Sequence, residues 1–249
     1  AGNVDFNGDL DVDGTTNLDV VDIDGAVDMA STLTVAGNVV IDGGTIKLDG
    51  NYPTGTDNVA LGDTAGDSLT SGIDNTLIGS QAGTALTDAD YNTAIGFKAL
   101  NADTLGSKST AVGRGALLTQ NFTSATDSNN TAVGFNAGVL VTTGTNNTLI
   151  GGIAGDAITT GSNNVALGHD SLGLNTTGDS NTAIGEDALQ ANTTASNNVA
   201  VGRRAMFANT TGTDNVAMGH NALDANTTAS NNTAIGHDAL TENTTGTRN

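Results

Sequence analysis

The chain has 249 residues, with 27 acidic against 7 basic side chains and a formal net charge of −20. It contains no cysteine, so disulfides cannot hold it together, and its aromatic content of 3% excludes a conventional aromatic-rich core. The strong negative charge argues against nucleic-acid binding and favours an exposed, self-repelling surface. We find no signal peptide and no apolar run long enough to insert into a membrane.

Residues 1–50 consist of short segments in which apolar residues alternate with aspartate, separated by glycines. Such alternation predicts short strands, and the irregular spacing predicts an irregular β stalk. Residues 51–57, with the single proline Pro53, then form a connector. The start of a calcium-binding EF-hand loop is matched by residues 9–14, but its twelfth position is Val20 instead of glutamate. Outward aspartates on strands are the favoured interpretation, and weak calcium binding along the stalk stays open.

Residues 58–249 form a repeat region marked by a recurring glycine. The spacing is 17 residues throughout, except for one step of 21 residues between Gly113 and Gly134. A period this short indicates stacked structural units. The glycines are Gly62, Gly79, Gly96, Gly113, Gly134, Gly151, Gly168, Gly185, Gly202, Gly219 and Gly236. Asn249 falls where a twelfth unit would open, so we expect the chain to be a segment of a longer protein.

Each repeat glycine follows a phrase of Asn, then Val or Thr, then usually Ala, then a large apolar residue. The alternation of β-branched residues predicts a short strand that ends at the glycine. Seventeen residues are too few for a helix pair, and the Gly, Asn and Thr content opposes helix, so an α-helical solenoid is disfavoured. We expect the large apolar residues to form an internal structural ladder: Ile78, Ile95, Val112, Val133, Ile150, Leu167, Ile184, Val201, Met218 and Ile235.

The predicted fold is therefore all-β: a parallel β-helix or β-roll solenoid of eleven 17-residue coils over residues 58–249. Neighbouring coils should lie ~4.8 Å apart, with asparagines stacked at one corner. The core of one coil is thin, and the alanine between the apolar residues is expected on the outward face. A small outward residue suggests close approach of another chain, so we expect an intertwined homotrimeric fibre.

The long repeat places its extra residues within 118–127, as a bulge in a turn. Phe122 would lie near the apex of this bulge and is a candidate lateral contact. If the strands on both sides stay in register, Arg114 should lie between the rings of Phe97 and Phe135, which occupy the same repeat position.

Stacking also predicts which charged side chains become neighbours one coil apart. Glu186 should lie beside Arg203, and Asp187 beside Arg204.

Three histidines, His169, His220 and His237, follow repeat glycines, and the last two could stack ~5 Å apart. A metal pair is conceivable, but a variable solvent position is favoured. The many Asn-x-Ser/Thr sequons arise from the repeat and are interpreted as turn chemistry instead of glycan acceptors. We predict no catalytic, cofactor-binding or metal-binding residues and no cofactor.

The phrase Asn-Thr-Ala-Ile-Gly at residues 232–236, followed by Ala-Leu, resembles the head repeats of trimeric autotransporter adhesins. It is also similar to repeats in tail-fibre proteins of marine bacteriophages, which residues 32–50 resemble especially. The resemblance implies a structural segment of a homotrimeric viral tail fibre in the virion. Its partners would be itself, other fibre or baseplate proteins and, through parts outside this segment, a host receptor, without nucleic acid or membrane insertion. The alternative is a bacterial trimeric surface adhesin; an enzyme on a β-helix is disfavoured.

Overall fold

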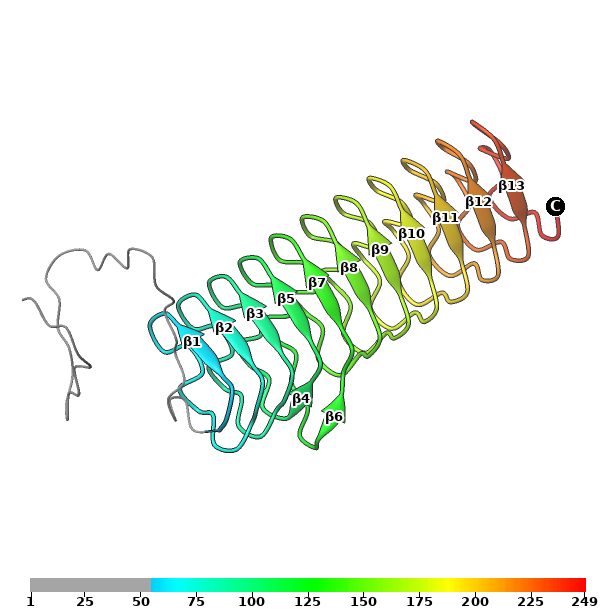
Figure 1. The fold of residues 1–249 in the computed structure, drawn as a ribbon. Helices are drawn as coiled ribbons and strands as arrows, with labels where there is room; N and C mark the ends of the chain where they lie inside the picture. Colours follow the sequence, from blue (N-terminus) through cyan, green and yellow to red (C-terminus); the bar gives the residue numbers. More distant parts are fainter. Residues whose placement is uncertain (1–54) are drawn as a thin grey trace, which may run out of the picture. The chain divides into compact units, whose positions relative to one another are not determined.

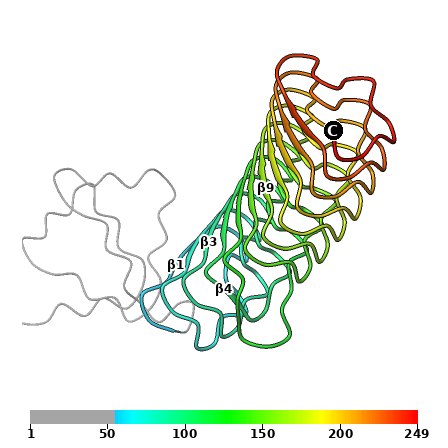
Figure 2. The same cartoon turned by 90° about the vertical axis from the view of Figure 1, so that its right-hand side faces the viewer.

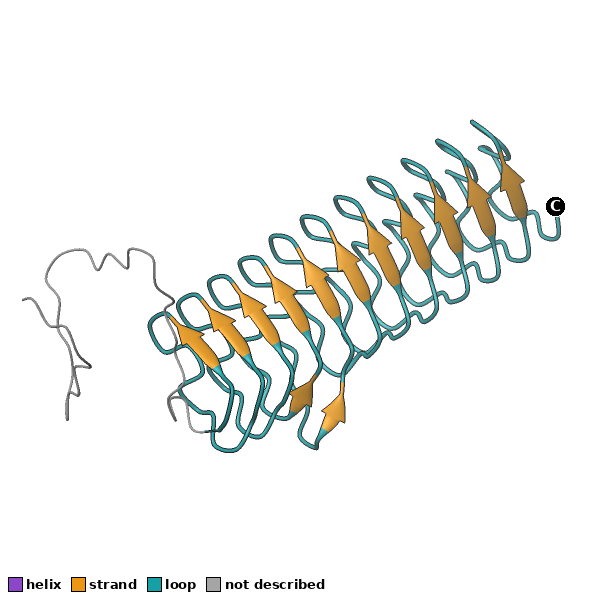
Figure 3. Cartoon of the chain, viewed as in Figure 1, coloured by secondary structure: helices purple, strands orange, loops and turns teal. Residues whose placement is uncertain are grey.

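The computed structural model describes residues 55–249, which form a parallel β-solenoid (Figures 1 and 3). One long sheet contains β1 (Val59–Leu61), β2 (Thr76–Ile78), β3 (Thr93–Ile95), β5 (Thr110–Val112), β7 (Thr131–Val133), β8 (Thr148–Ile150), β9 (Val165–Leu167), β10 (Thr182–Ile184), β11 (Val199–Val201), β12 (Val216–Met218) and β13 (Thr233–Ile235). A two-stranded sheet pairs β4 (Gly106–Ser107) with β6 (Thr126–Asp127). The predicted stalk, the calcium-loop match and residues 51–54 of the connector lie outside the described residues.

Every neighbouring pair in the long sheet is parallel and separated by one coil. Thr182 pairs with Val199, and Ile184 with Val201, so equal repeat positions lie side by side. Seen along the solenoid, the coils nest one behind the next (Figure 2). The 17-residue register predicted from the glycine spacing is confirmed. Within residues 55–249 we find no helix that is long and apolar enough to cross a membrane.

The repeat glycines are required by both backbone conformation and space. Their φ angles run from +126° to +143°, a region that other residues avoid. A Cβ added to Gly151 would lie 2.4 Å from the carbonyl oxygen of Gly168, the equivalent glycine one coil further on. The same clash repeats along the solenoid, so glycine is what lets successive coils stack this closely.

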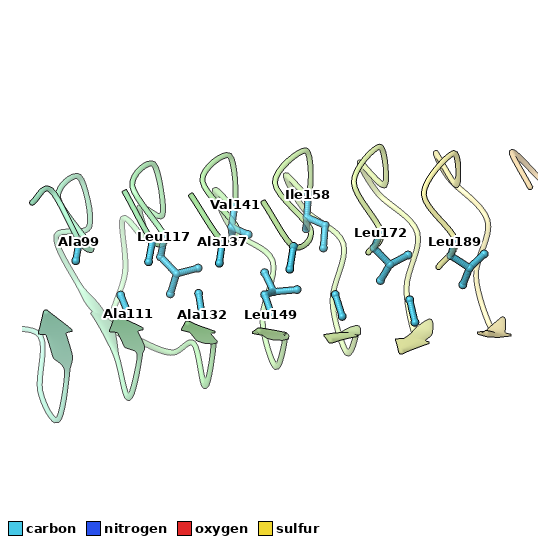
Figure 4. Packing of buried hydrophobic residues seen from close by; sticks show 14 of the residues in the cluster. Ala99, Ala111, Leu117, Ala132, Ala137, Val141, Leu149, Ile158, Leu172 and Leu189 are labelled. Carbon is cyan, nitrogen blue, oxygen red and sulfur yellow. The ribbon is translucent and has the colours of Figure 1, made fainter. Parts of the chain in front are cut away.

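The side chain at the centre of each strand faces the core, and the two flanking side chains face outward. The central residue is alanine in most coils and is fully buried, as at Ala111 and Ala183. Opposite the strand, a second segment contributes buried leucines such as Leu117 and Leu189 (Figure 4). The expectation that the large apolar ladder lies inside and the alanine outside was therefore wrong in its choice of face.

The physical reason is the short strand and the thin coil. Alternation over three residues separates the centre from the flanks, but it does not say which set faces inward. The space between the strand and the opposite segment already holds a leucine, so it accepts only a small central residue. Leu77 and Leu149 are the exceptions, and their methyl groups fill the space beside glycines of the opposite segment: Gly83 beside Leu77, and Gly138 and Gly155 beside Leu149.

The predicted ladder of stacked asparagines is present and buried. The Asn75 backbone N–H donates to the side-chain oxygen of Asn58 at 2.8 Å, and the Asn75 amide donates to the carbonyl of Ala89. The same pattern repeats in later coils, for example from Asn181 to Asn164. Each side chain thus satisfies backbone groups of neighbouring coils that would otherwise be buried without partners.

A second asparagine ladder occupies another corner of the later coils. The Asn192 amide donates to the side-chain oxygen of Asn175 and to the carbonyl of Ala195, both at 3.0 Å. Asn175, Asn192, Asn209 and Asn226 are fully buried, although each begins a sequon. The turn interpretation of these sequons is consistent with their contacts, because the buried amides are occupied by hydrogen bonds within the protein.

Candidate interaction surface

The outer face of the long sheet carries a continuous column of apolar side chains. Register places Leu61, Ile78 and Ile95 in a row, and the row continues through the predicted ladder. Several members are strongly exposed, with Leu167 at 43% and Ile235 at 68%. The stacking of this ladder is confirmed, but its members cover the outside of the strand instead of filling the core.

The column is large enough to require an explanation. Eleven strands at a spacing of ~4.8 Å make a face roughly 50 Å long, and three residues make it about 10 Å wide. Position two residues earlier adds partly exposed Val or Thr, as at Val165 and Val199. Contiguous apolar surface of about 500 Å² is at the upper end for a monomeric soluble protein and is typical of an interaction site.

An aromatic cluster lies next to this column. The Arg114 guanidinium carbon lies 5.8 Å from the Phe97 ring centre and 5.4 Å from that of Phe135, as the repeat spacing predicted. Both rings are exposed, at 43% and 53%. Since the arrangement needs β5 and β7 to be paired directly, it also confirms that the long coil leaves the strands in register.

The long coil places three of its four extra residues before Thr126, inside the predicted interval, and the fourth between Asp127 and Thr131. Up to Asn121 the backbone bonds follow the ordinary pattern; Gly106 then pairs with Thr126, a shift of three residues, and Thr110 pairs with Thr131, a shift of four. Phe122 is only 6% exposed, and its backbone N–H donates to the carboxylate of Asp103 at 3.1 Å. Phe122 as an exposed lateral contact is therefore wrong: the ring faces the coil because the loop folds back over Gly106.

A buried polar network underlies this loop and was not expected. Gln120 donates to Asp103 at 2.5 Å and to Ser109 at 2.8 Å, and it accepts from the Asn130 amide at 2.8 Å. Ser109 stands where every other coil has the ladder asparagine. The sequence did contain this signal, since the one missing asparagine occurs in the coil that precedes the insertion.

The charged ladder is confirmed in one pair and different in the other. Arg203 Nε lies 3.1 Å from a Glu186 carboxylate oxygen. Arg204 instead pairs with Asp224 at 3.3 Å and lies over the ring of Phe207 at 4.3 Å. The prediction considered only the same repeat position, whereas a long arginine side chain also reaches the opposite segment of the next coil.

Two carboxyl groups have raised pKa values where the middle coils meet. Burial raises the pKa of Asp156, and the nearby carboxylate of Asp170 adds to the effect. Burial also raises the pKa of Asp170, opposed by a hydrogen bond from Gln190 and reinforced by Asp187. The causes are desolvation and like charge, which describe a crowded acidic surface instead of a designed proton donor.

The histidines at equivalent positions are brought together as expected. The rings of His220 and His237 stack with centroids 5.2 Å apart and an interplanar angle of 11°. Asp238 lies beside His237, with 2.9 Å between carboxylate and Nδ1. His169 is exposed and lies three coils away, so it does not join this group. Among the described residues, His220, His237 and Asp238 form a group that could hold a metal ion.

Comparison with known proteins adds no relative. No family model matches the chain, and neither a curated protein nor a solved structure matches it. The class that the fold defines is a β-solenoid of 17-residue coils, and functional inference rests on its surface.

Proposed function

We propose that this chain is a structural rod segment of a homotrimeric fibre, most specifically a viral tail fibre whose other parts attach to a host cell. The observation that supports it is the apolar column on the outer face of the long sheet. The original reason, an outward alanine, does not hold, because the alanines are buried. The outward ladder of Ile, Val, Leu and Met gives the same proposal a stronger reason, since burying it against other chains stabilises the assembly.

A threefold arrangement suits the dimensions of this face. The column is one strand wide, so a single chain offers a narrow strip instead of a broad sheet. Three such strips can meet around one axis and exclude water along the whole rod, in a closed symmetry that leaves no strip exposed. The negative charge of the chain then lies on the outside, where it keeps fibres apart. Virion attachment and host binding would be carried by other parts of the fibre.

The same rod would serve the head or shaft of a bacterial trimeric surface adhesin. That alternative shares the repeat phrase and the assembly, and it places the protein on a bacterial cell surface instead of in a virion. The complete gene separates the two: a carboxy-terminal membrane barrel indicates an adhesin, whereas neighbouring baseplate genes indicate a phage.

Light scattering of the purified chain tests the assembly. We expect a mass of three times 24.6 kDa, which is 73.8 kDa. The double substitution Ile184→Lys and Val201→Lys places two charges in the middle of the column and should give monomers with an unchanged circular dichroism spectrum. Leu174→Lys is the matched control, because Leu174 is 48% exposed but lies outside the strands. A monomeric wild type, or a trimer that tolerates both lysines, contradicts the proposal.

A further inference from the structure

The strongest unassigned cluster is the group His220, His237 and Asp238, whose histidines hold the repeat position directly after the glycine and so lie beside the apolar column. One nitrogen or oxygen ligand atom from each side chain lies within 4.8 Å of the other two. The two rings are held parallel by the stacking of their coils, and Asp238 follows His237 directly in the chain. The solenoid thus gathers two imidazoles and one carboxylate from only two coils.

A second observation concerns the state of His220. Its Nδ1 atom is enclosed by surrounding protein and has no hydrogen-bond partner. Its other nitrogen, Nε2, lies 3.4 Å from Arg203 Nη1. An enclosed ring nitrogen without a partner is unfavourable, because it has lost water and gained nothing in return. A ligand bond at Nδ1 removes that penalty.

We propose that His220, His237 and Asp238 bind one divalent transition-metal ion of the zinc type per chain. Imidazole and carboxylate ligands together suit zinc and its neighbours, whereas calcium and magnesium prefer oxygen ligands alone. Two ligand bonds of ~2.1 Å span at most about 4.2 Å, so the 4.8 Å group must close by a few tenths of an ångström. His237 and Asp238 are exposed and can make that movement.

Two neighbouring side chains affect the cluster in opposite ways: Asn221 orients the Asp238 carboxylate, and the positive charge of Arg203 near His220 opposes a bound cation. The Asn221 amide donates to Asp238 Oδ1 at 3.1 Å, which orients the carboxylate and leaves Oδ2 toward His237. Metal at His220 Nδ1 leaves the proton on Nε2, which then cannot accept from Arg203. The Arg203 guanidinium is partly neutralised by Glu186, 3.1 Å away. Its remaining charge should weaken binding.

Calorimetric titration of the untagged full chain with Zn²⁺, followed by Co²⁺ absorption spectroscopy, tests the site. We expect one ion per chain and a cobalt spectrum with the intensity of a site of four or five ligands. His220→Gln and His237→Gln should each weaken zinc binding at least about tenfold, since even residues that only support a ligand have effects of this size. Arg203→Gln should tighten binding about threefold by removing a nearby positive charge.

His169→Gln is the matched control, because His169 holds the same repeat position without a neighbouring histidine. It should bind zinc as the wild type does. Absence of zinc binding by the wild type overturns the proposal, and so does equal binding by the double variant His220→Gln and His237→Gln. A rise in melting temperature with zinc, seen in the wild type and in His169→Gln but absent from the double variant, supports it independently of the calorimetry.

Discussion

The early and late coils of the solenoid fill the same interior in two different ways. In four of the six early coils the fourth residue after the repeat glycine is itself a glycine, and three residues later comes a buried Leu, Val or Ile. The other two early coils carry Leu100 and Leu117 at the fourth position, followed by the buried polar residues Asp103 and Gln120. In the late coils the fourth residue after the repeat glycine is Leu or Met, and the residue three positions later is a buried Asn. The early set is Gly66, Gly83, Gly138 and Gly155 with Leu69, Leu86, Val141 and Ile158; the late set is Leu172, Leu189, Met206 and Leu223 with Asn175, Asn192, Asn209 and Asn226.

The difference shows that coil geometry is fixed by backbone stacking, while core chemistry is exchangeable. Both kinds of coil pair their strands in the same parallel register. In the early coils a large side chain can come from the strand, as at Leu149, whose methyl groups fill the space beside Gly138 and Gly155. In the late coils it comes from the opposite segment, and the freed corner is closed by hydrogen bonds between asparagines.

Placing the large opposite residue of the late coils in an early coil should have the largest effect on stability. In Gly155→Leu, the new Cβ would lie 2.8 Å from both Ile158 Cδ1 and Leu149 Cδ2, at a residue whose φ is +57°. We expect the free energy of unfolding to fall by about 4 kcal/mol, from overpacking and backbone strain together. Chemical denaturation followed by circular dichroism measures the loss.

A compensating change makes this test sharper. Adding Leu149→Ala to Gly155→Leu reproduces the late arrangement of small strand residue and large opposite residue. The double variant should therefore be more stable than the sum of the two single losses predicts, by about 1–3 kcal/mol of coupling. Simple additivity in the double-mutant cycle would show that the two positions do not share one space.

Breaking the late corner should have the next largest effect. Asn192→Ala removes the donor to Asn175 and the acceptor that serves the Asn209 amide. Leaving these buried groups without partners should lower the free energy of unfolding by about 2–3 kcal/mol. Val141→Ala, at the equivalent corner of an early coil, removes only apolar contact and should disturb no hydrogen bond. Equal amide-exchange protection around both sites would contradict the asparagine ladder.

The junction between the two regions should show a smaller effect that depends on pH. Asp156 belongs to the last early coil and Asp170 to the first late coil, and the pKa of each is raised by burial and a neighbouring carboxylate. A raised pKa in the folded state means that the ionised form is disfavoured there. The raised pKa therefore lowers the stability of the fold fully above the folded pKa. This penalty is lost as the pH falls through the folded pKa, and it is absent below the ordinary carboxyl pKa.

Asp156→Asn removes this penalty. We expect a gain of less than about 1 kcal/mol at neutral pH, which disappears near pH 2, where the carboxyl is protonated in both states. Asp63→Asn, at an exposed carboxyl of an early coil, is the control and should change little at either pH. A gain that persists in acid would assign the effect to packing instead of charge.

The surface ion pairs of the late coils should have the smallest effect. The Glu186–Arg203 pair is about half exposed on both sides. Glu186→Gln should change the free energy of unfolding by no more than about 0.5 kcal/mol, and added salt should reduce even that. A loss above 1 kcal/mol, measured by denaturation at low salt, would show that this pair stabilises the late coils more than its exposure suggests.

The sequence predicts those features that depend on the repeat period alone. The register, the stacked asparagines, the Arg114 contacts and the His220–His237 stack all follow from equal positions lying side by side. The trimer, by contrast, stays a prediction, because spacing within one chain carries no information on how many chains associate.

The inward face could not be deduced from alternation, because in a three-residue strand either the central residue or the two flanking residues could face the core. One signal would have resolved it. Leu77 and Leu149 interrupt the alanine column in coils that carry Gly83 and Gly155, and such an exchange of volume identifies positions that face each other. The burial of Phe122 could not be found in this way, because its loop has no second copy in the chain to compare with.

Because the step between coils is constant, the length of the solenoid is set by the number of its coils. Because each strand meets its neighbours at the same repeat positions, the gain or loss of one complete coil would change the length by ~4.8 Å and leave every column continuous. Unequal recombination between gene segments that encode equal repeat positions would produce such changes in whole units. The length could thus change during evolution through the number of coils alone, while each coil keeps the same surfaces.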